Sequence, residues 1–318
     1  RSGHTPDPVP YDKEIVQYPH VQIVSEKTKP ETADSDAMMT TETLAIAFGI
    51  GSAAAWGAGD FSGGMASRRG NVLKVVWYSQ FIGGLFLLGM AVFSGEIIPP
   101  VRDLVYGAFA GVFGNIGLIA LYRGLSTGRM GIVAPLSAVL TALVPIVYTA
   151  FFTGLPSMTR FSGFVCFAVA VWLLSSADAG FRMTGRELLL SCVAGAGFGL
   201  FFIFIDKAND LAIFWPLVWA RVASVVFLSF VMLVAAKPKA PVTGQWGFIV
   251  MAGVLDALGN LLFSAAAYLG RLDVSAVLSS LYPAATVLLA WVVLREKLKR
   301  RQWMGVGAAF IALGLISI

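Results

Sequence analysis

Ionisable side chains interrupt the apolar stretches of this sequence at only a few positions, and these residues are the first candidates for chemistry. Arg221 lies in an apolar run that begins near Phe214. Asp256 lies in the next run, which begins near Gln245. Because a helix rises about 1.5 Å per residue, two antiparallel neighbouring helices bring these charges to a similar depth. The pair either lines a cavity, where Asp256 takes up a proton or a cationic group when Arg221 releases it, or forms a static strut.

A second carboxylate lies one helical turn from an aromatic ring. Trp56 and Asp60 share one helix face, as do Asp256 and Asn260. An aromatic ring beside a carboxylate suits an organic cation, whereas a Trp near the end of a span is also typical of an interface anchor. Asp60 lies about 24 Å along the helix from Leu44, toward the far end of that span. Both interpretations of Trp56 stay open.

Neutral polar residues and prolines complete the candidate site. Gln80 and Asn115 fall near mid-depth, where each either hydrogen-bonds a solute or joins two helices. Pro145 and Pro283 are candidate hinges. The residues expected to bind or couple a solute are Trp56, Asp60, Gln80, Asn115, Arg221, Asp256, Asn260 and Tyr282. No catalytic residue, metal ligand or cofactor is predicted.

The elements that position these residues belong to an integral membrane protein. Of the 318 residues, 57% are hydrophobic and only 13% are charged. Runs of about 20 apolar residues, which cross a bilayer core as helices, predict an all-α fold with ten transmembrane helices. These runs begin near Leu44, Val72, Leu104, Ile132, Phe161, Glu187, Phe214, Gln245, Val274 and Gln302. Residues 1–40 are polar and predict a disordered tail. This tail is either extra sequence, which is non-native or lies upstream of the natural start, or a short docking segment.

An internal repeat divides the spans into two halves, 41–178 and 179–318. The collinear matches are Ser137–Leu140 with Ser275–Leu278, Pro145 with Pro283, Gly128-Arg129 with Gly270-Arg271, and Val76-Trp77 with Val218-Trp219. Because each half holds five spans, an odd number, the second half is expected to be inverted relative to the first. Such inverted repeats predict alternating access around a solute site at the middle of the membrane.

Two other classes of protein remain as alternatives to a transporter. Residues 57–60 read Gly-Ala-Gly-Asp, the GxGD string of intramembrane aspartyl proteases, whose chemistry needs two carboxylates that share a proton. Asp256 is the candidate partner. Measured from the same face of the membrane, however, Asp60 is expected at a depth of about 24 Å and Asp256 at about 13 Å, which is too far apart for a shared proton. The other alternative is a membrane scaffold that transports nothing. The sequence contains no HExxH, CxxC, Walker or Rossmann string, so nucleotide hydrolysis is not expected.

The segment from Ser275 to Ile318 begins with small residues, contains Pro283, leaves its span through Arg295-Glu296-Lys297-Leu298 and ends in a Gly-rich run. With the Trp56-Gly57 pair and Arg221, it resembles EamA-type members of the drug/metabolite transporter superfamily, over Leu44 to the C-terminus. The first half departs from the family pattern at Gly154-Leu155-Pro156, where an acidic residue is usual, and at Ser79, near the position that corresponds to Arg221. The resemblance implies ten helices in two inverted repeats, a central cavity, and movement of metabolites, amino acids or drugs, often outward.

The distribution of charge predicts orientation and partners. Loops after the odd-numbered spans hold most of the Lys and Arg residues, so the positive-inside rule places these loops in the cytoplasm and both termini outside. The resemblance implies the opposite orientation, with both termini inside. The expected location is a bacterial inner (plasma) membrane. The expected partners are the lipid bilayer and a small-molecule solute, with or without proton coupling, in a monomer or homodimer, and no nucleic acid.

Overall fold

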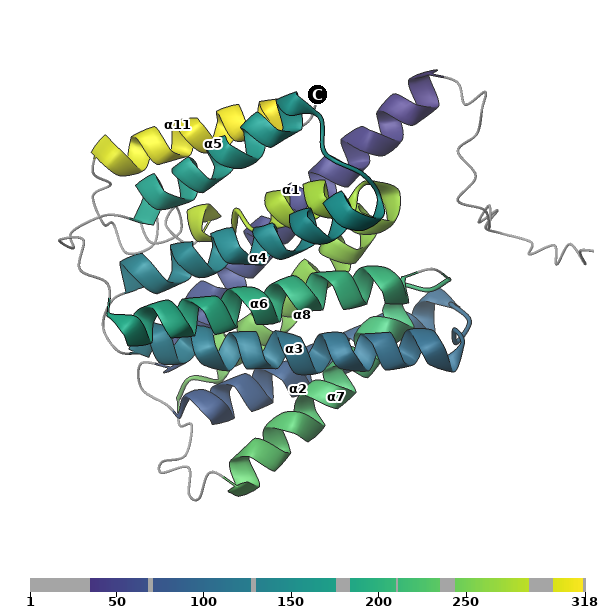
Figure 1. The fold of residues 1–318 in the computed structure, drawn as a ribbon. Helices are drawn as coiled ribbons and strands as arrows, with labels where there is room; N and C mark the ends of the chain where they lie inside the picture. Colours follow the sequence, from purple (N-terminus) through teal and green to yellow (C-terminus); the bar gives the residue numbers. More distant parts are fainter. Residues whose placement is uncertain are drawn as a thin grey trace, which may run out of the picture. The chain divides into compact units, whose positions relative to one another are not determined.

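The computed structural model describes residues 35–67, 71–126, 130–175, 184–209, 211–234, 244–285 and 300–316. Within these ranges every regular element is helical, as predicted (Figure 1). The helices are α1 (Ser35–Ser67), α2 (Val72–Ser94), α3 (Val101–Ser126), α4 (Met130–Phe152), α5 (Met158–Ser175), α6 (Gly185–Ala208), α7 (Phe214–Val234), α8 (Trp246–Leu269), α9 (Leu272–Ser279) and α11 (Arg300–Ile316). The predicted span starts lie close to these helix starts, with the first span as the exception.

The first helix begins earlier than the sequence predicted. Residues 35–40 were expected in the tail, but α1 already begins at Ser35. A span that has formed a helix extends it into the adjoining segment at little cost, because nucleation is the expensive step. This segment also contains Ala and Met, which favour helix. The rest of the predicted tail lies outside the described residues.

Several helices have the length and composition of membrane spans. In the described ranges, six helical segments are long and apolar enough to cross a bilayer, and they lie in α1, α2, α3, α6, α7 and α8. Two shorter apolar segments are Leu136–Phe152 in α4 and Met158–Leu173 in α5. The described part of the protein is therefore all-helical with six membrane-length helices, and the count of ten spans stays a prediction.

The ninth predicted span is not a continuous helix. α9 ends at Ser279, and a turn precedes the next helical residue, Tyr282. Pro283 accounts for the break, because proline lacks an N–H and its ring crowds the carbonyl four residues earlier. Pro145, at the matching repeat position, lies within α4 without interrupting it. The two prolines thus differ in their local effect, and their role as hinges stays a prediction.

The contacts between helices repeat in the two halves of the chain. α1 packs on α8 and α9, while its counterpart α6 packs on α3 and α4. Likewise, α2 packs on α8, and its counterpart α7 packs on α3. Two further contacts each join a helix to its own counterpart, α2 to α7 and α5 to α11. Figure 1 shows α3 beside α6 and α5 beside α11. Exchanging the first five helices for the second five leaves these contacts unchanged, which is what a two-fold relation between repeats requires.

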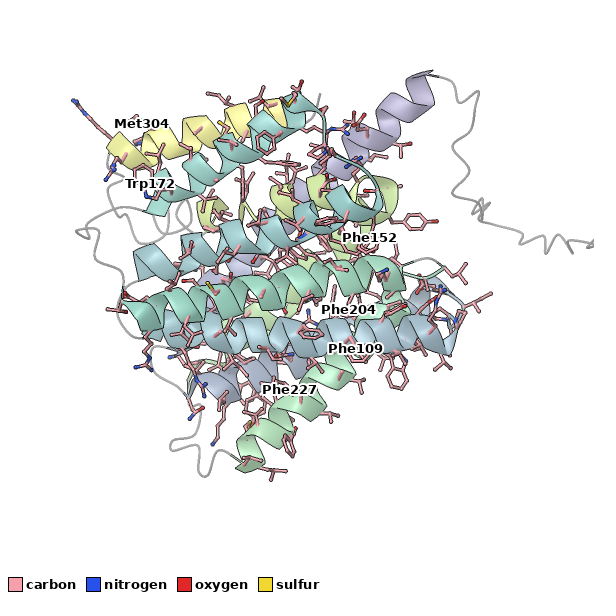
Figure 2. All side chains as sticks on the ribbon, viewed as in Figure 1. Phe109, Phe152, Trp172, Phe204, Phe227 and Met304 are labelled. Carbon is pink, nitrogen blue, oxygen red and sulfur yellow. The ribbon has the colours of Figure 1, made fainter. Side chains whose placement is uncertain are left out.

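Aromatic side chains occupy two of these helix contacts. Between α3 and α6, Phe204 stacks on Phe113 with ring centroids 5.4 Å apart and lies 5.5 Å from Phe109 (Figure 2). Between α5 and α11, the Arg301 guanidinium lies 4.9 Å from the ring centroid of Trp172. A cation over an exposed Trp ring contributes about 0.5–1 kcal/mol. Ring stacking thus contributes to the contact between α3 and α6, and a cation–π interaction contributes to the contact between α5 and α11.

A carboxylate from the segment between α2 and α3 fixes the start of α7. Glu96 accepts hydrogen bonds from the backbone N–H groups of Ile213, Phe214 and Trp215 at 2.7, 2.9 and 3.1 Å. The Trp215 Nε1–H donates to the Glu96 carbonyl at 2.9 Å. These N–H groups would otherwise lack partners at the helix N-terminus, where the helix dipole also favours a negative charge. Glu96 therefore ties the end of α2 to α7.

We expect Glu96→Ala to destabilise the protein by about 1–2 kcal/mol, the cost of losing a helix cap that carries a charge. Glu96→Gln keeps an acceptor and loses the charge, so it should cost less. Thermal unfolding of the three purified proteins in one detergent ranks them. Equal midpoints for the wild type and the Ala variant would show that the cap contributes nothing to stability.

Candidate functional site

One cavity inside the bundle gathers the polar residues predicted from the sequence. It is partly open, with about 670 Å³ of empty space that includes open solvent, and it lies among α1, α2, α3, α4, α6, α7, α8 and the helical residue Tyr282 that follows α9. Its lining residues are Trp56, Asp60, Gln80, Gly111, Gly114, Asn115, Leu118, Thr141, Phe198, Phe201, Phe202, Ala220, Arg221, Ser224, Asp256, Asn260 and Tyr282. All eight residues predicted to bind or couple a solute are among them, whereas Pro145 and Pro283 are not. Whether these residues bind a solute stays a prediction.

Three of these residues form a hydrogen-bonded network across α2, α7 and α8. Arg221 Nη1 donates to Asp256 Oδ2 at 2.6 Å and also to the side-chain oxygen of Gln80. Gln80 Nε2 donates to the same Asp256 oxygen at 3.1 Å. The two charges therefore lie at one depth and pair. Gln80 joins helices, which was the alternative to its solute-binding role.

The two members of the ion pair differ in their access to the cavity. The Arg221 side chain is 5% exposed, and its Nη2 has no hydrogen-bond partner in the described part of the chain and no contact with solvent. The Asp256 side chain is 32% exposed. A buried guanidinium costs several kcal/mol unless it is paired, so Asp256 is what allows Arg221 to lie here. Asp256, rather than Arg221, is the member that a solute or proton can reach.

Trp56 lies inside the bundle and in the cavity wall. Its ring stacks on Phe202 and Phe263, with centroids 5.6 and 5.9 Å apart, and its Nε1–H donates to Asn260 Oδ1 at 3.1 Å. Gly259 makes room for the indole, because a Cβ at that position would lie 2.5 Å from Trp56 Cδ1. The ring is therefore held by stacking and a hydrogen bond, which is a different environment from an interfacial belt.

The predicted separation of Asp60 and Asp256 is wrong. Both line the same cavity, and a Cβ added to Gly59 would lie 3.3 Å from the backbone nitrogen of Asp256. The estimate took Leu44 as the membrane boundary of an untilted helix, whereas α1 runs from Ser35 to Ser67. The depth argument against an aspartyl protease therefore fails. The carboxylates differ in another way, because Arg221 holds Asp256, while Asp60 has no hydrogen bond or ion pair with any described residue.

Asn115 bonds within its own helix. Its Nδ2 donates to the Gly111 carbonyl at 2.9 Å, and its Oδ1 has no partner in the described ranges. The interhelical bond that was one expectation for Asn115 is therefore not formed. Ser224 instead joins two helices, because its Oγ–H donates to the same Gly111 carbonyl at 3.2 Å.

Sequence reasoning missed the aromatic part of the lining. Phe198, Phe201 and Phe202 of α6 all face the cavity. Phe201 and Phe202 follow Phe198 by three and four residues, a spacing that places all three rings on one face of the helix. The positions between them and next to them are rich in glycine. Thr141 was missed as well, although it lies four residues before Pro145, which cannot donate a hydrogen bond to the Thr141 carbonyl.

Comparisons with known proteins identify the family and the fold of the chain. The model of the EamA-like transporter family matches residues 43–176 and, a second time, residues 185–318. A solved structure titled "Crystal structure of protein" is similar in fold, with a TM-score of 0.71 over 89% of this chain and 96% of that chain at 15% identity. No curated protein matches the sequence. The two family matches cover most of the chain, which is an integral membrane protein with two EamA repeats and belongs to the EamA-like transporter family.

Proposed function

We propose that this protein is a secondary transporter that moves a small organic solute by alternating access around the cavity, as efflux or exchange. The observation that carries this proposal is the Arg221–Gln80–Asp256 network in the cavity wall. Ionisable side chains within membrane spans are costly and usually mark a solute or ion pathway. A scaffold would gain nothing from a polar cavity at this position.

The repeated helix contacts support the mechanism. Contacts that are unchanged when the two halves are exchanged fit two inverted five-helix repeats, 41–178 and 179–318, and ten spans in all. In such a plan the site lies between the repeats, and rocking of one repeat against the other opens it to each side in turn. Residues from both family matches line the cavity, as this mechanism requires.

Reconstitution into liposomes tests the proposal. Purified protein is assayed with labelled organic cations, amino acids and nucleobases, with protein-free liposomes as the control. We expect saturable, protein-dependent uptake of at least one class and counterflow when the same unlabelled solute is inside. A folded, correctly inserted protein that moves none of these solutes would favour the scaffold and count against transport.

We further expect Asp256→Asn to uncouple transport from a proton gradient. In the proposed cycle, Asp256 takes up a proton when Arg221 releases it, and Asn cannot do so. The variant keeps a side-chain oxygen that can accept hydrogen bonds from Gln80 and Arg221 but loses the charge that pairs with Arg221, so thermal unfolding checks that it folds. Solute flux is then measured with and without an imposed pH difference. Unchanged coupling in the folded variant would rule out this role for Asp256.

The orientation that we propose has both termini outside, in a bacterial inner membrane, because the loops after odd-numbered spans are rich in Lys and Arg. A C-terminal reporter that is active only in the cytoplasm tests this orientation, which predicts an inactive reporter.

A further inference from the structure

Close glycine contacts match α1 and α3 of the first repeat with α6 and α8 of the second. Gly117 packs against Phe198, and Gly259 packs against Trp56. Gly117 and Gly259 are 142 residues apart, and so are Trp56 and Phe198. The same contact is therefore made twice, with the roles of the two halves exchanged.

A second pair of contacts gives the same spacing. Gly114 packs against Phe201, and Gly59 packs against the backbone of Asp256. Gly59 and Phe201 are again 142 residues apart, as are Gly114 and Asp256. This spacing therefore identifies which residues occupy equivalent positions on the two sides of the cavity.

Three of four equivalent pairs combine a polar residue on one side with an apolar residue on the other. The spacing pairs Trp56 with Phe198, Asp60 with Phe202, Asn260 with Leu118, and Asp256 with Gly114. One side of the cavity is thus an acidic wall (Trp56, Asp60, Asp256 and Asn260), and the other is an aromatic wall (Phe198, Phe201 and Phe202). A cavity with such walls suits a solute that is polar at one end and apolar at the other.

The charges in the cavity favour a cation over an anion. Among the lining residues the charged side chains are Asp60, Arg221 and Asp256. Arg221 is occupied by Asp256 and Gln80, and its remaining terminal nitrogen is out of reach of solvent. Among the described lining residues, no cation is left for a carboxylate or phosphate on the solute. Asp60 has no partner among the described residues, and an isolated carboxylate in this setting favours a positive charge beside it.

We propose that the solute is an amphipathic organic monocation whose charged head binds Asp60 beside the Trp56 ring and whose apolar body lies on the aromatic wall. This inference rests on the proposed transport function and names its substrate class. Trp56 stacks on Phe202 at 5.6 Å, so the head and body subsites are contiguous. Aromatic faces attract cations as well as apolar groups.

Equilibrium binding to the full-length protein in nanodiscs tests the proposal. The probes are benzyltrimethylammonium, tetraphenylphosphonium, the uncharged benzyl alcohol and the anion phenylacetate. The wild type should bind at least one cation saturably and should not bind phenylacetate. Asp60→Asn should weaken cation binding by about 30-fold, because it removes the charge and keeps the shape. Asp60→Glu should restore most of the affinity, and Phe198→Ala should weaken both cations without introducing phenylacetate binding.

Three results would overturn the assignment. They are equal cation affinity in the wild type and a folded Asp60→Asn variant, tighter binding of phenylacetate than of either cation, and saturable binding of neither cation. The liposome assay keeps the two proposals distinguishable. Flux of anionic or neutral solutes alone would leave transport standing and remove the cation assignment. Asp60-dependent cation binding without any flux would support the cation site and count against transport.

Discussion

Replacing Arg221 by Met is expected to lower the free energy of unfolding by about 3 kcal/mol and to abolish transport. The substitution leaves the Asp256 carboxylate without its charged partner, and Gln80 alone cannot compensate a charge inside the membrane. Breaking a buried ion pair by removing one member typically costs about 3–5 kcal/mol. We place this pair at the low end because Asp256 is 32% exposed. Denaturant unfolding in detergent measures the stability, and liposome flux measures the activity.

The double variant Arg221→Met with Asp256→Leu is the matched control. It replaces both charges with apolar groups of similar size, which often costs little or even stabilises a protein. We therefore expect most of the lost stability to return while transport stays absent. If the double variant were less stable than Arg221→Met alone, the uncompensated charge would not be the cause of the loss.

Replacing Gly253 by Ala is the second substitution with a large expected effect. A Cβ at Gly253 would lie 2.5 Å from the Ser79 carbonyl oxygen, and one at Gly83 would lie 2.7 Å from the Gly253 carbonyl oxygen. The backbones of α2 and α8 are therefore in direct contact, and an added methyl group must push them apart. Overpacking of this kind costs about 1–3 kcal/mol. It would also move Gln80 away from Asp256 and so lower transport.

Gly247→Ala on the same helix is the control for Gly253→Ala, because nothing lies within 4 Å of its added Cβ. It should unfold at the wild-type midpoint or above, since Ala favours helix more than Gly does. Thermal unfolding and initial rates of flux are compared for both variants. Equal behaviour of the two variants would show that the α2–α8 contact does not position the network.

Much of the fold follows from local features of the sequence. Apolar length predicts where most helices begin, and the SAVL repeat predicts a duplication that the two family matches bear out. The pairing of Arg221 with Asp256 follows from rise per residue in neighbouring antiparallel helices. Each of these properties depends on a single helix or on two helices that follow one another in the chain, so the sequence is enough to predict it.

Other features depend on how helices tilt and approach, which residue spacing does not specify. The level of Asp60 is set by the contact of Gly59 with α8, and the depth estimate missed it. The cap on α7 joins Glu96 to backbone groups 117 or more residues away, and nothing near Glu96 in the sequence indicates it. The aromatic wall was missed because Phe residues in an apolar span are equally suited to face lipid.

Side-specific labelling of a cysteine in the cavity tests alternating access. Leu118→Cys, made with Cys166→Ser and Cys192→Ser, places one thiol in the cavity lining. Membrane-impermeant maleimide is applied to one face of oriented proteoliposomes at a time, with and without a solute that the liposome assay shows to be transported. We predict labelling from either face and protection by that solute from both. Labelling from one face only, or from both faces without protection, would contradict alternating access.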